Sequence, residues 1–329
     1  MKRLSPLLVL ALSIPSFATQ YSASGMVLRV DRVHKNFVVS CQSIPGLMDA
    51  MTMPFDVRET KELEGLTPGT MVDFTLVVEG ASSYAEHIHV RAYESVEQDP
   101  LTARRLKLLN HLTHPEVSSK PLAIGERVPD FALIDQRRQR VTLSEYGGKV
   151  VALNFIYTSC ALPDFCYRIS NNFGVLQRRF RKQLGRDLVL LTVTFDPERD
   201  QPETLARYAE NWKADPATWH FLTGAVPDVR RVTSMFGMDF FPDEGLMDHS
   251  LHTAIIDRQR KLVANIEGNQ FTADQLADLV KDVLNQFHRR KPVKPVYWPS
   301  KDVGMEMFQA PGTSFRMRDQ VNIATLSAE

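Results

Sequence analysis

Two cysteines are the residues of this chain whose type and spacing best fit metal binding or redox chemistry. Cys160 and Cys166 have five residues between them, and they directly follow the apolar run KVVALNFIY at residues 149–157. Such a run is typical of a strand covered on both faces, and helical spacing follows at 167–184. The strand-to-helix turn favours a thiolate, which is both a nucleophile and a metal ligand. The pair therefore fits a metal site or a dithiol–disulfide couple, and an inert disulfide is the alternative without function.

A third donor, His249, stands in the segment DHSLHT at the entry to an expected strand. A loop there can fold back over the carboxyl end of the first strand, where ligands collect in open α/β sheets. An imidazole with two thiolates forms a soft site that suits monovalent copper and accepts the divalent ion. Taken alone, a histidine here is more often a capping or surface residue. His252, which begins the strand, is the competing candidate.

A second group of soft donors consists of Cys41, Met48, Met51 and Met53. Met51 and Met53 alternate, so on a strand they point to one face, and Cys41 ends the preceding strand. Thioethers do not protonate and hold monovalent copper weakly, which suits a carrier that must release its cargo. A methionine pair in a small barrel is more often part of the core.

The other histidines, methionines and acidic residues that could act as donors are not assigned a chemical role. His87 and His89 are interpreted as surface residues, Met305 and Met307 as part of the tail, and the acidic segment 196–200 as a loop and helix entry.

The elements that must position these donors divide the chain into two units. Residues 21–95 contain short β-branched stretches separated by turn residues, which predicts a small all-β, OB-like, five-stranded barrel. Residues 96–121 predict a helix and a polar linker. Residues 122–288 alternate between strand and helix in a thioredoxin-like α/β order, and residues 289–329 form an irregular tail. The elements expected in the second unit are strands at 149–157, 187–195, 219–222, 253–257 and 262–266 and helices at 167–184, 202–212, 226–236 and 272–287.

The first 18 residues have the pattern of a secretory signal peptide. Lys2 and Arg3 precede a short apolar run at 7–14, and Ser16 and Ala18 supply the small residues of a cleavage site. An uncleaved anchor is the alternative, and no later segment is apolar for long enough to span a bilayer. We therefore expect an exported, soluble, periplasmic protein. In an oxidising compartment the odd number of cysteines, three, needs an explanation.

Composition bounds the remaining possibilities. The chain has 329 residues, 43% hydrophobic and 24% charged, which is typical of a globular protein of about two domains. Lys and Arg number 39, as do Asp and Glu, so no basic excess points to nucleic acid. Phosphate-binding, serine hydrolase and zinc protease motifs are absent from the sequence.

Residues 122–288 resemble the Sco/SenC family of thioredoxin-like copper proteins. The segments that carry the resemblance are GERVPDF at 125–131, NFIYTSC at 154–160, PDFC at 163–166, TFDPERD at 194–200 and DHS at 248–250. The resemblance implies that Cys160, Cys166 and His249 are copper ligands. It also implies delivery of copper, or reduction of thiols, at the binuclear copper centre of cytochrome c oxidase. The family motif has three residues between its cysteines, and it has proline where this chain has Ala161 and Tyr167.

Residues 21–92 resemble the CusF-like periplasmic copper-binding domain, a five-stranded barrel. The carrying segment is IPGLMDAMTMPF at 44–55. In that family one histidine and two methionines bind copper and a tryptophan covers the site. By this resemblance Met51 and Met53 are ligands, Cys41 stands near the position of the histidine, and Met48 stands near that of the tryptophan.

These patterns favour a periplasmic copper metallochaperone, a carrier more than an enzyme. In this hypothesis the barrel collects copper, ligand exchange through shared sulfur donors moves it between the two sites, and the Cys160 site passes it to a partner such as an oxidase subunit. The alternative is a thiol–disulfide oxidoreductase, which uses both cysteines but does not need His249. Reductases of this type usually place a cis-proline before the facing strand, where this chain has a potential ligand instead. A peroxidase, suggested by kinship of fold, is a third and weaker hypothesis.

Overall fold

The computed structural model describes residues 18–91, 120–243 and 246–286, together with residues 101, 104, 108, 109 and 112 between the first two ranges. Nearly all of the expected signal peptide, most of the segment 96–121 and the tail at 289–329 lie outside the described residues. Within the described part of the chain, no helix has both the length and the apolar character needed to cross a bilayer.

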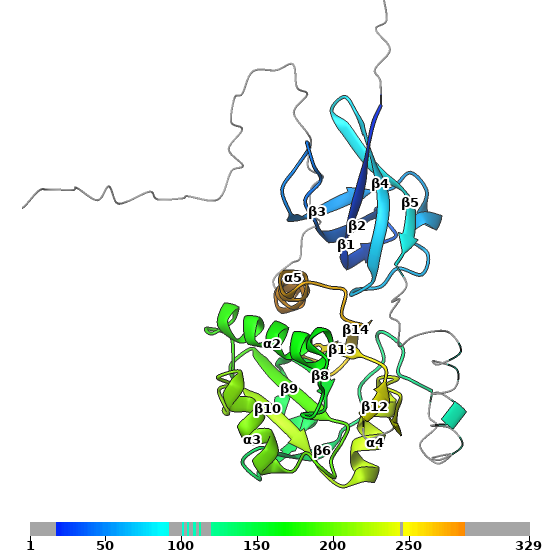
Figure 1. Cartoon of the computed structure of the whole chain (residues 1–329). Coiled ribbons are helices and arrows are strands. Elements are labelled where there is room, and N and C mark those ends of the chain that lie inside the picture. Colours follow the sequence, from blue (N-terminus) through cyan, green and yellow to red (C-terminus); the bar gives the residue numbers. More distant parts are fainter. Residues whose placement is uncertain are drawn as a thin grey trace, which may run out of the picture.

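The first unit is a five-stranded antiparallel barrel, as the sequence predicts (Figure 1). Its strands are β1 (Thr19–Asp31), β2 (Asn36–Cys41), β3 (Met51–Asp56), β4 (Met71–Glu79) and β5 (Ser82–Val90), with the 3-10 turn η1 (Thr60–Leu63) after β3. They pair in the order β3-β2-β1-β4-β5, and a bridge between Val57 and Ala85 joins the two outer strands. Three phenylalanine rings, Phe37, Phe55 and Phe74, pack together at 4.9–5.9 Å inside the barrel.

The second unit is a thioredoxin-like α/β domain around a seven-stranded sheet of order β14-β13-β8-β9-β10-β6-β7. The strands are β6 (Ala132–Asp135), β7 (Arg140–Thr142), β8 (Val150–Ile156), β9 (Leu188–Thr194), β10 (Trp219–Thr223), β13 (His252–Ile256) and β14 (Leu262–Glu267). The central strands β8, β9 and β10 are parallel, and β8 and β9 are buried along their whole length, which explains their uninterrupted apolar sequences.

The helices of this domain lie close to the expected ranges. They are α2 (Arg168–Arg179), α3 (Pro202–Asn211), α4 (Val226–Met235) and α5 (Ala273–Asn285), with short turns η4 (Leu143–Tyr146) and η5 (Pro163–Tyr167). Thr272 caps α5 through a reciprocal pair of hydrogen bonds with Gln275. The helix α2 ends five residues before the expected end, because the chain turns near Gly185, at φ +76°, to enter β9. The hairpin β6–β7 and the two-stranded ribbon β11 (Phe240–Asp243)–β12 (Leu246–His249) were not expected.

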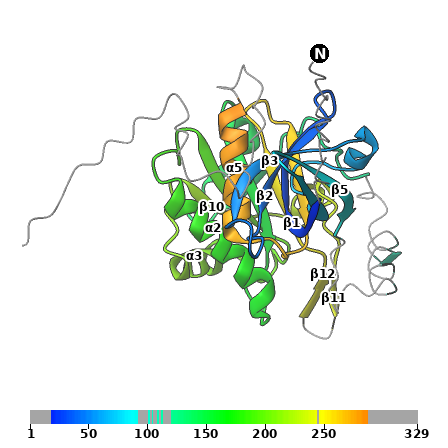
Figure 2. The ribbon, with the colours of Figure 1, turned by 90° about the horizontal axis from the view of Figure 1, so that it is seen from above.

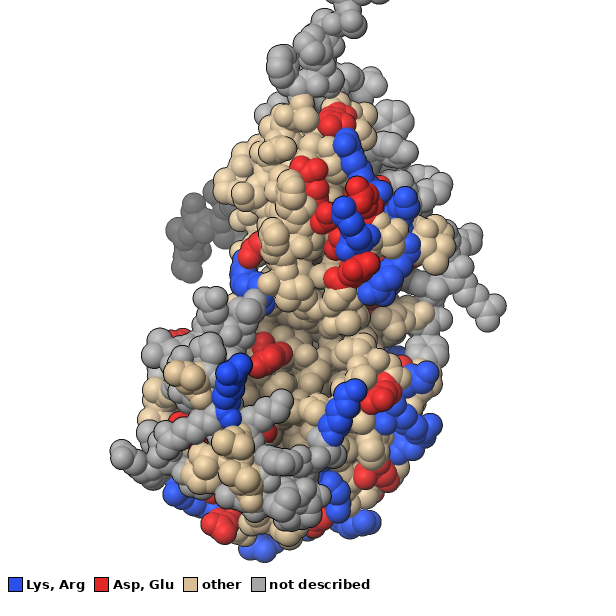
Figure 3. Space-filling view, turned by 90° about the vertical axis from the view of Figure 1, so that its right-hand side faces the viewer, with Lys and Arg blue, Asp and Glu red and all other residues tan. Residues whose placement is uncertain are grey.

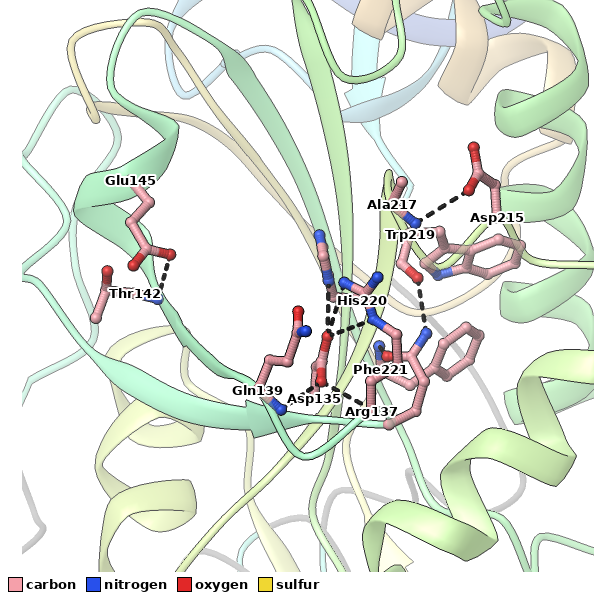
Figure 4. A network of polar contacts seen from close by, with 11 residues as sticks. Asp135, Arg137, Gln139, Thr142, Glu145, Asp215, Ala217, Trp219, His220 and Phe221 are labelled. Carbon is pink, nitrogen blue, oxygen red and sulfur yellow. Dashed lines mark hydrogen bonds and ion pairs between the residues drawn. The ribbon is translucent and has the colours of Figure 1, made fainter.

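A buried polar network fixes the β6–β7 hairpin to the sheet (Figure 4). The Asp135 carboxylate accepts hydrogen bonds from the backbone N–H groups of Arg137 and Gln139, both at 2.8 Å. Its other oxygen lies 3.3 Å from Nδ1 of His220 on β10. Burial raises the pKa of Asp135, but these hydrogen bonds outweigh it and leave the pKa below its ordinary value. The network lies on strands remote from Cys160, so we assign it a structural role.

The two units share a hydrophobic core. The barrel residues Met26, Leu28, Val38 and Met71 point out of the barrel, yet they are buried in the core of the second domain. In Figures 1 and 2 the barrel lies against α5 and the adjacent edge of the seven-stranded sheet. On the face seen in Figure 3, acidic and basic side chains are mixed over both units, in keeping with a net charge of zero. The two domains are therefore joined by a packed interface.

Candidate metal centre

The two thiols lie at the carboxyl end of the central strand β8. After β8 ends at Ile156 the chain turns, and Cys166 lies in the wide turn η5, just before α2 begins. Phe165 has φ −107° and ψ −110°, outside the helical region, so the segment does not continue as a regular helix. This distortion accommodates the five residues between the cysteines. Cys166 is 1% exposed, whereas Cys160 is half-buried.

His249 comes to the thiols from the β11–β12 ribbon. It is the last residue of β12 and pairs with Phe240 of β11, so it lies on a strand and not in the expected loop. Its Nδ1 donates a hydrogen bond of 2.9 Å to the carbonyl oxygen of Ser250. Because a carbonyl only accepts, Nδ1 carries the proton and Nε2 keeps its lone pair for a ligand.

Aromatic rings surround the imidazole of His249. The centroids of Phe195, Tyr157 and Phe165 lie 4.9, 5.6 and 6.3 Å from that of the histidine ring. These rings restrict the rotation of the imidazole and exclude water from one side of it. The histidine is therefore oriented before any ligand arrives.

The structure brings the three donors together at one point. The ligand atoms of Cys160, Cys166 and His249 all lie within 4.8 Å of one another, and all three cysteines of the chain are free thiols. A metal bound at about 2.3 Å from each sulfur needs donors at most about 4.6 Å apart, so a small side-chain movement suffices. Two thiols and one imidazole are a soft donor set, which fits copper better than a hard cation. The residues present therefore fit a copper ion.

The electrostatics of the pair are asymmetric. A hydrogen bond from Cys166 is the largest cause that lowers the pKa of Cys160 to about 4, although burial acts in the opposite direction. The same contact and burial raise the pKa of Cys166 well above its ordinary value. Burial and the neighbouring thiolate raise the pKa of Tyr157 as well. One thiolate and one thiol thus face the imidazole at neutral pH, and metal binding must displace the second proton.

Asp200 supports this site and was missed by the sequence interpretation, which treated the acidic segment only as a loop and helix entry. It is fully buried, and its carboxylate accepts hydrogen bonds from the backbone N–H and hydroxyl of Thr158 at 3.0 and 2.5 Å. It also accepts one from the hydroxyl of Thr194 at 2.5 Å. The signal was in the sequence: the two threonines follow or end neighbouring parallel strands, so one carboxylate at that edge can reach both.

The competing candidate, His252, is not part of the group. Its Nδ1 lies 3.2 Å from the side-chain oxygen of Asn265, and burial lowers its pKa to about 4. His87 is exposed and lies near Glu86. Among the described histidines, cysteines and acidic residues, the group that could hold a metal is the one that contains Cys160, Cys166 and His249.

The barrel donors lie at one end of the β2–β3 pair. Cys41 is directly across from Met51, and Met53 is across from Val39. Met48 lies in the connecting loop, where its backbone exchanges hydrogen bonds with Ile44 at 2.9 and 3.0 Å. Cys41 and Met53 are buried and Met51 is 50% exposed. Burial raises the pKa of Cys41 to about 11, so this thiol is protonated at neutral pH.

Fold and site together define a thioredoxin-like protein with a dithiol–imidazole centre, preceded by a β-barrel with its own soft donors. Comparison with known protein families agrees with both halves. Residues 122–285 match the SCO1/SenC family model, and residues 20–90 match the model of the copper binding periplasmic protein CusF. The chain thus consists of a CusF-type domain followed by a SCO1/SenC family domain.

Individual relatives each match less than half of this chain. Protein sco1 of Schizosaccharomyces pombe is 26% identical over 45% of this chain and 57% of its own length. A SCO2-like protein of Rickettsia typhi is 29% identical over 43% of this chain and 69% of its own length. The chain thus spans just over half of the first relative and about two thirds of the second. The copper-bound structure of ScoI from Arabidopsis thaliana is 27% identical, with a TM-score of 0.42 over 49% of this chain and 98% of that one.

Proposed function

We propose that this protein is an exported copper metallochaperone that binds copper through Cys160, Cys166 and His249. The observation that carries the proposal is the convergence of two sulfurs and one ring nitrogen within 4.8 Å from segments about 90 residues apart in sequence. Membership of the second domain in the SCO1/SenC family supports copper as the metal. The asymmetric protonation of the thiols makes one sulfur ready for a metal and leaves the second to be deprotonated on binding.

The proposed acceptor is the binuclear copper centre of cytochrome c oxidase, on the basis of the Sco/SenC motifs. The half-buried position of Cys160 supports transfer, because an incoming ligand from a partner can reach that sulfur before the buried Cys166. The periplasm is the proposed location, on the basis of the N-terminal pattern and the periplasmic CusF family.

We further propose that Cys41, Met51 and Met53, with Met48 nearby, form a second, weaker copper site in the barrel. The cross-strand pair of Cys41 and Met51 supports it. With a protonated thiol and two thioethers, this site holds monovalent copper less firmly than the dithiol centre.

Titration of the reduced protein with monovalent copper, in competition with a chromogenic chelator, tests the main site. Cys160→Ala and His249→Ala are expected to lose tight binding of one equivalent, because each removes one of three ligands. His87→Ala, at an exposed histidine outside the site, is the control and keeps it. If Cys160→Ala still binds two equivalents of copper, one at each proposed site, the proposal is contradicted.

A thiol–disulfide oxidoreductase is the second candidate, and a specific observation favours it. A thiolate at Cys160 beside a protonated thiol at Cys166 is also the arrangement of an attacking and a resolving cysteine. The His249→Ala variant separates the two functions. If copper delivery is the function, this variant loses copper and the partner's copper centre is not assembled, although thiol exchange persists. If reduction of the partner is the function, assembly with the variant proceeds at the rate seen with the unmodified chain.

A further inference from the structure

The copper-binding end of the barrel faces the second domain. A cavity of about 500 Å³ lies between the two units, and both Cys41 and Met51 line it. The opposite wall comes from Arg179, the last residue of α2, and from the first two turns of α5. Cys41 and Met51 are therefore beside the carboxyl end of α2.

Direct contacts hold this end of the barrel in place. Asp278 of α5 accepts hydrogen bonds from the hydroxyls of Ser40 and Thr52 at 2.8 and 3.0 Å. Arg179 donates to Asp278 at 3.0 Å, which orients the carboxylate. Together with the four buried apolar residues of the shared core, these contacts leave no freedom for the β2–β3 edge to swing away without exposing that core.

The Cys160 centre lies at the other end of the same helix. Cys166 precedes the first residue of α2 by two positions, and Arg179 is thirteen residues further on. At about 1.5 Å per residue, the separation along the helix is on the order of 20 Å. Figures 1 and 2 likewise show β12, which ends at His249, well apart from the β2–β3 edge. Exchange of a metal through shared donors requires donors of both sets to bind one ion at the same time, so these donors must come within about 5 Å of each other.

We infer that the two copper sites of one chain do not exchange copper with each other. The barrel is held against α5 so that each site exchanges only with a separate molecule, and the chain carries two copper ions independently. This inference rests on the proposed function for the cargo, but its geometric part does not need any metal. It replaces the expectation that copper moves from the barrel to the Cys160 centre by ligand exchange within one chain.

Backbone ¹⁵N relaxation of the metal-free protein tests the geometric part. Both domains are expected to tumble with one correlation time, that of a single body. The variant Leu28→Lys/Met71→Lys places charges in the shared core while leaving the inside of the barrel unchanged, and it is expected to give two shorter correlation times. Two different correlation times in the unmodified protein overturn the inference, whether or not either site binds copper.

The transfer itself is tested by its dependence on protein concentration. The protein with Cys160 and Cys166 oxidised to a disulfide is loaded with one equivalent of monovalent copper, and excess phosphine then reduces the disulfide. Appearance of thiolate–copper absorption at the Cys160 centre is followed over a hundredfold range of protein concentration. Copper stays monovalent throughout and only its ligands change.

A transfer rate proportional to protein concentration supports the inference. A rate that is independent of concentration, and faster than both disulfide reduction and copper release to a chelator in the same phosphine, shows transfer within one chain and overturns it. Leu28→Lys/Met71→Lys is expected to gain a concentration-independent phase, and if it gains none, the interface is not what keeps the sites apart. If the oxidised protein binds no copper, the proposed barrel site fails instead, and the relaxation measurement still decides the geometry.

Discussion

Two side chains of the same type behave differently at Cys160 and Cys166 because one is half-exposed and the other is buried. The thiol of Cys166 donates a hydrogen bond that stabilises the Cys160 thiolate, and the buried position of Cys166 disfavours a second negative charge. Cys41 has no such partner, and burial alone keeps it protonated. The three cysteines thus differ in reactivity.

Alkylation of the reduced, metal-free protein at pH 6 reports this difference. The pKa of about 4 leaves Cys160 ionised at pH 6, while the pKa of about 11 leaves Cys41 almost wholly protonated. We expect iodoacetamide to modify Cys160 at least about ten times faster than Cys41, after allowance for the weaker intrinsic nucleophilicity of a low-pKa thiolate. Peptide mass spectrometry measures both rates, and equal modification of the two residues contradicts the assignment.

The Asp200 carboxylate is expected to position the cysteine loop. Asp200→Asn weakens the contacts to Thr158 and Thr194, so we expect a loss of about 2–3 kcal/mol in the free energy of unfolding. The loop shift is expected to weaken copper binding by about 10- to 100-fold, as for other residues that support metal ligands. Chemical denaturation and chelator competition measure the two effects.

Asp196→Asn is the matched control for this variant. Burial and the charge of Asp200 raise the pKa of Asp196, so its ionised form is disfavoured in the folded protein. Its replacement is expected to leave stability and copper affinity unchanged or slightly improved. An equal loss of affinity in both variants indicates a general effect of charge and contradicts the role of Asp200.

At the scale of elements, the β13–β14 hairpin and the β11–β12 ribbon give two nearby histidines opposite roles. His249 ends a ribbon at the mouth of the site, whereas His252 begins a strand that is buried along its whole length. The strand holds His252 against Asn265, so that its ring supports the hairpin and does not reach the thiols.

Protonation of His252 is expected to make the hairpin sensitive to acid. Its folded-state pKa of about 4 lies below the unfolded value of about 6.5, so the unfolded chain binds the proton first as the pH falls. Above pH 6.5 the neutral ring of His252 does not reduce the free energy of unfolding. As the pH falls from 6.5 to 4, this free energy decreases by up to about 3 kcal/mol because of His252. His252→Gln is expected to remove this part of the pH dependence. Denaturation at pH 7 and pH 4.5 gives the unfolding free energy of the unmodified protein and of the variant. An equal change in this free energy between the two pH values for both proteins contradicts the prediction.

At the scale of the whole molecule, the two domains approach each other closely at Gly69. Its backbone has φ +90°, and a Cβ there would lie 2.8 Å from a side-chain carbon of Ile266 in β14. Gly69 is thus required both for its turn in the barrel and for contact between the domains. No comparable crowding exists at Gly46, which has φ +76° and nothing within 4 Å.

A comparison of Gly69→Ala with Gly46→Ala separates the interface from backbone strain. Both variants incur the cost of a side chain at positive φ, about 1–2 kcal/mol. Only Gly69→Ala also forces β14 away from the barrel, so we expect its unfolding free energy to fall by a further 1–3 kcal/mol, roughly. Denaturation curves measure the difference, and equal losses indicate that the domains are not packed at this point.

Local sequence determined most of the elements and identified the three donors. The apolar runs of β8 and β9 and the spacing of the helices predicted the central strands and their order along the chain, and the cysteine pair at the end of β8 indicated the proposed site. These features are readable because strand burial and helix periodicity act over short stretches of chain. Short or irregular elements, such as β7 and the turn η5, carry too little local pattern to be predicted.

Tertiary structure alone decided which residues support the donors and how the two sites are related. The contacts of Asp200 with Thr158, and of Asp278 with Ser40, join residues 42 and 238 positions apart. Such pairings depend on how separate strands and domains pack, and no periodicity in the sequence encodes them. The sequence by itself therefore determined that the chain holds two sets of soft donors. The packing of the barrel on α5 decided that the two donor sets lie near opposite ends of α2. Burial of the outward face of the barrel fixes the orientation of the barrel and therefore the position of its donors.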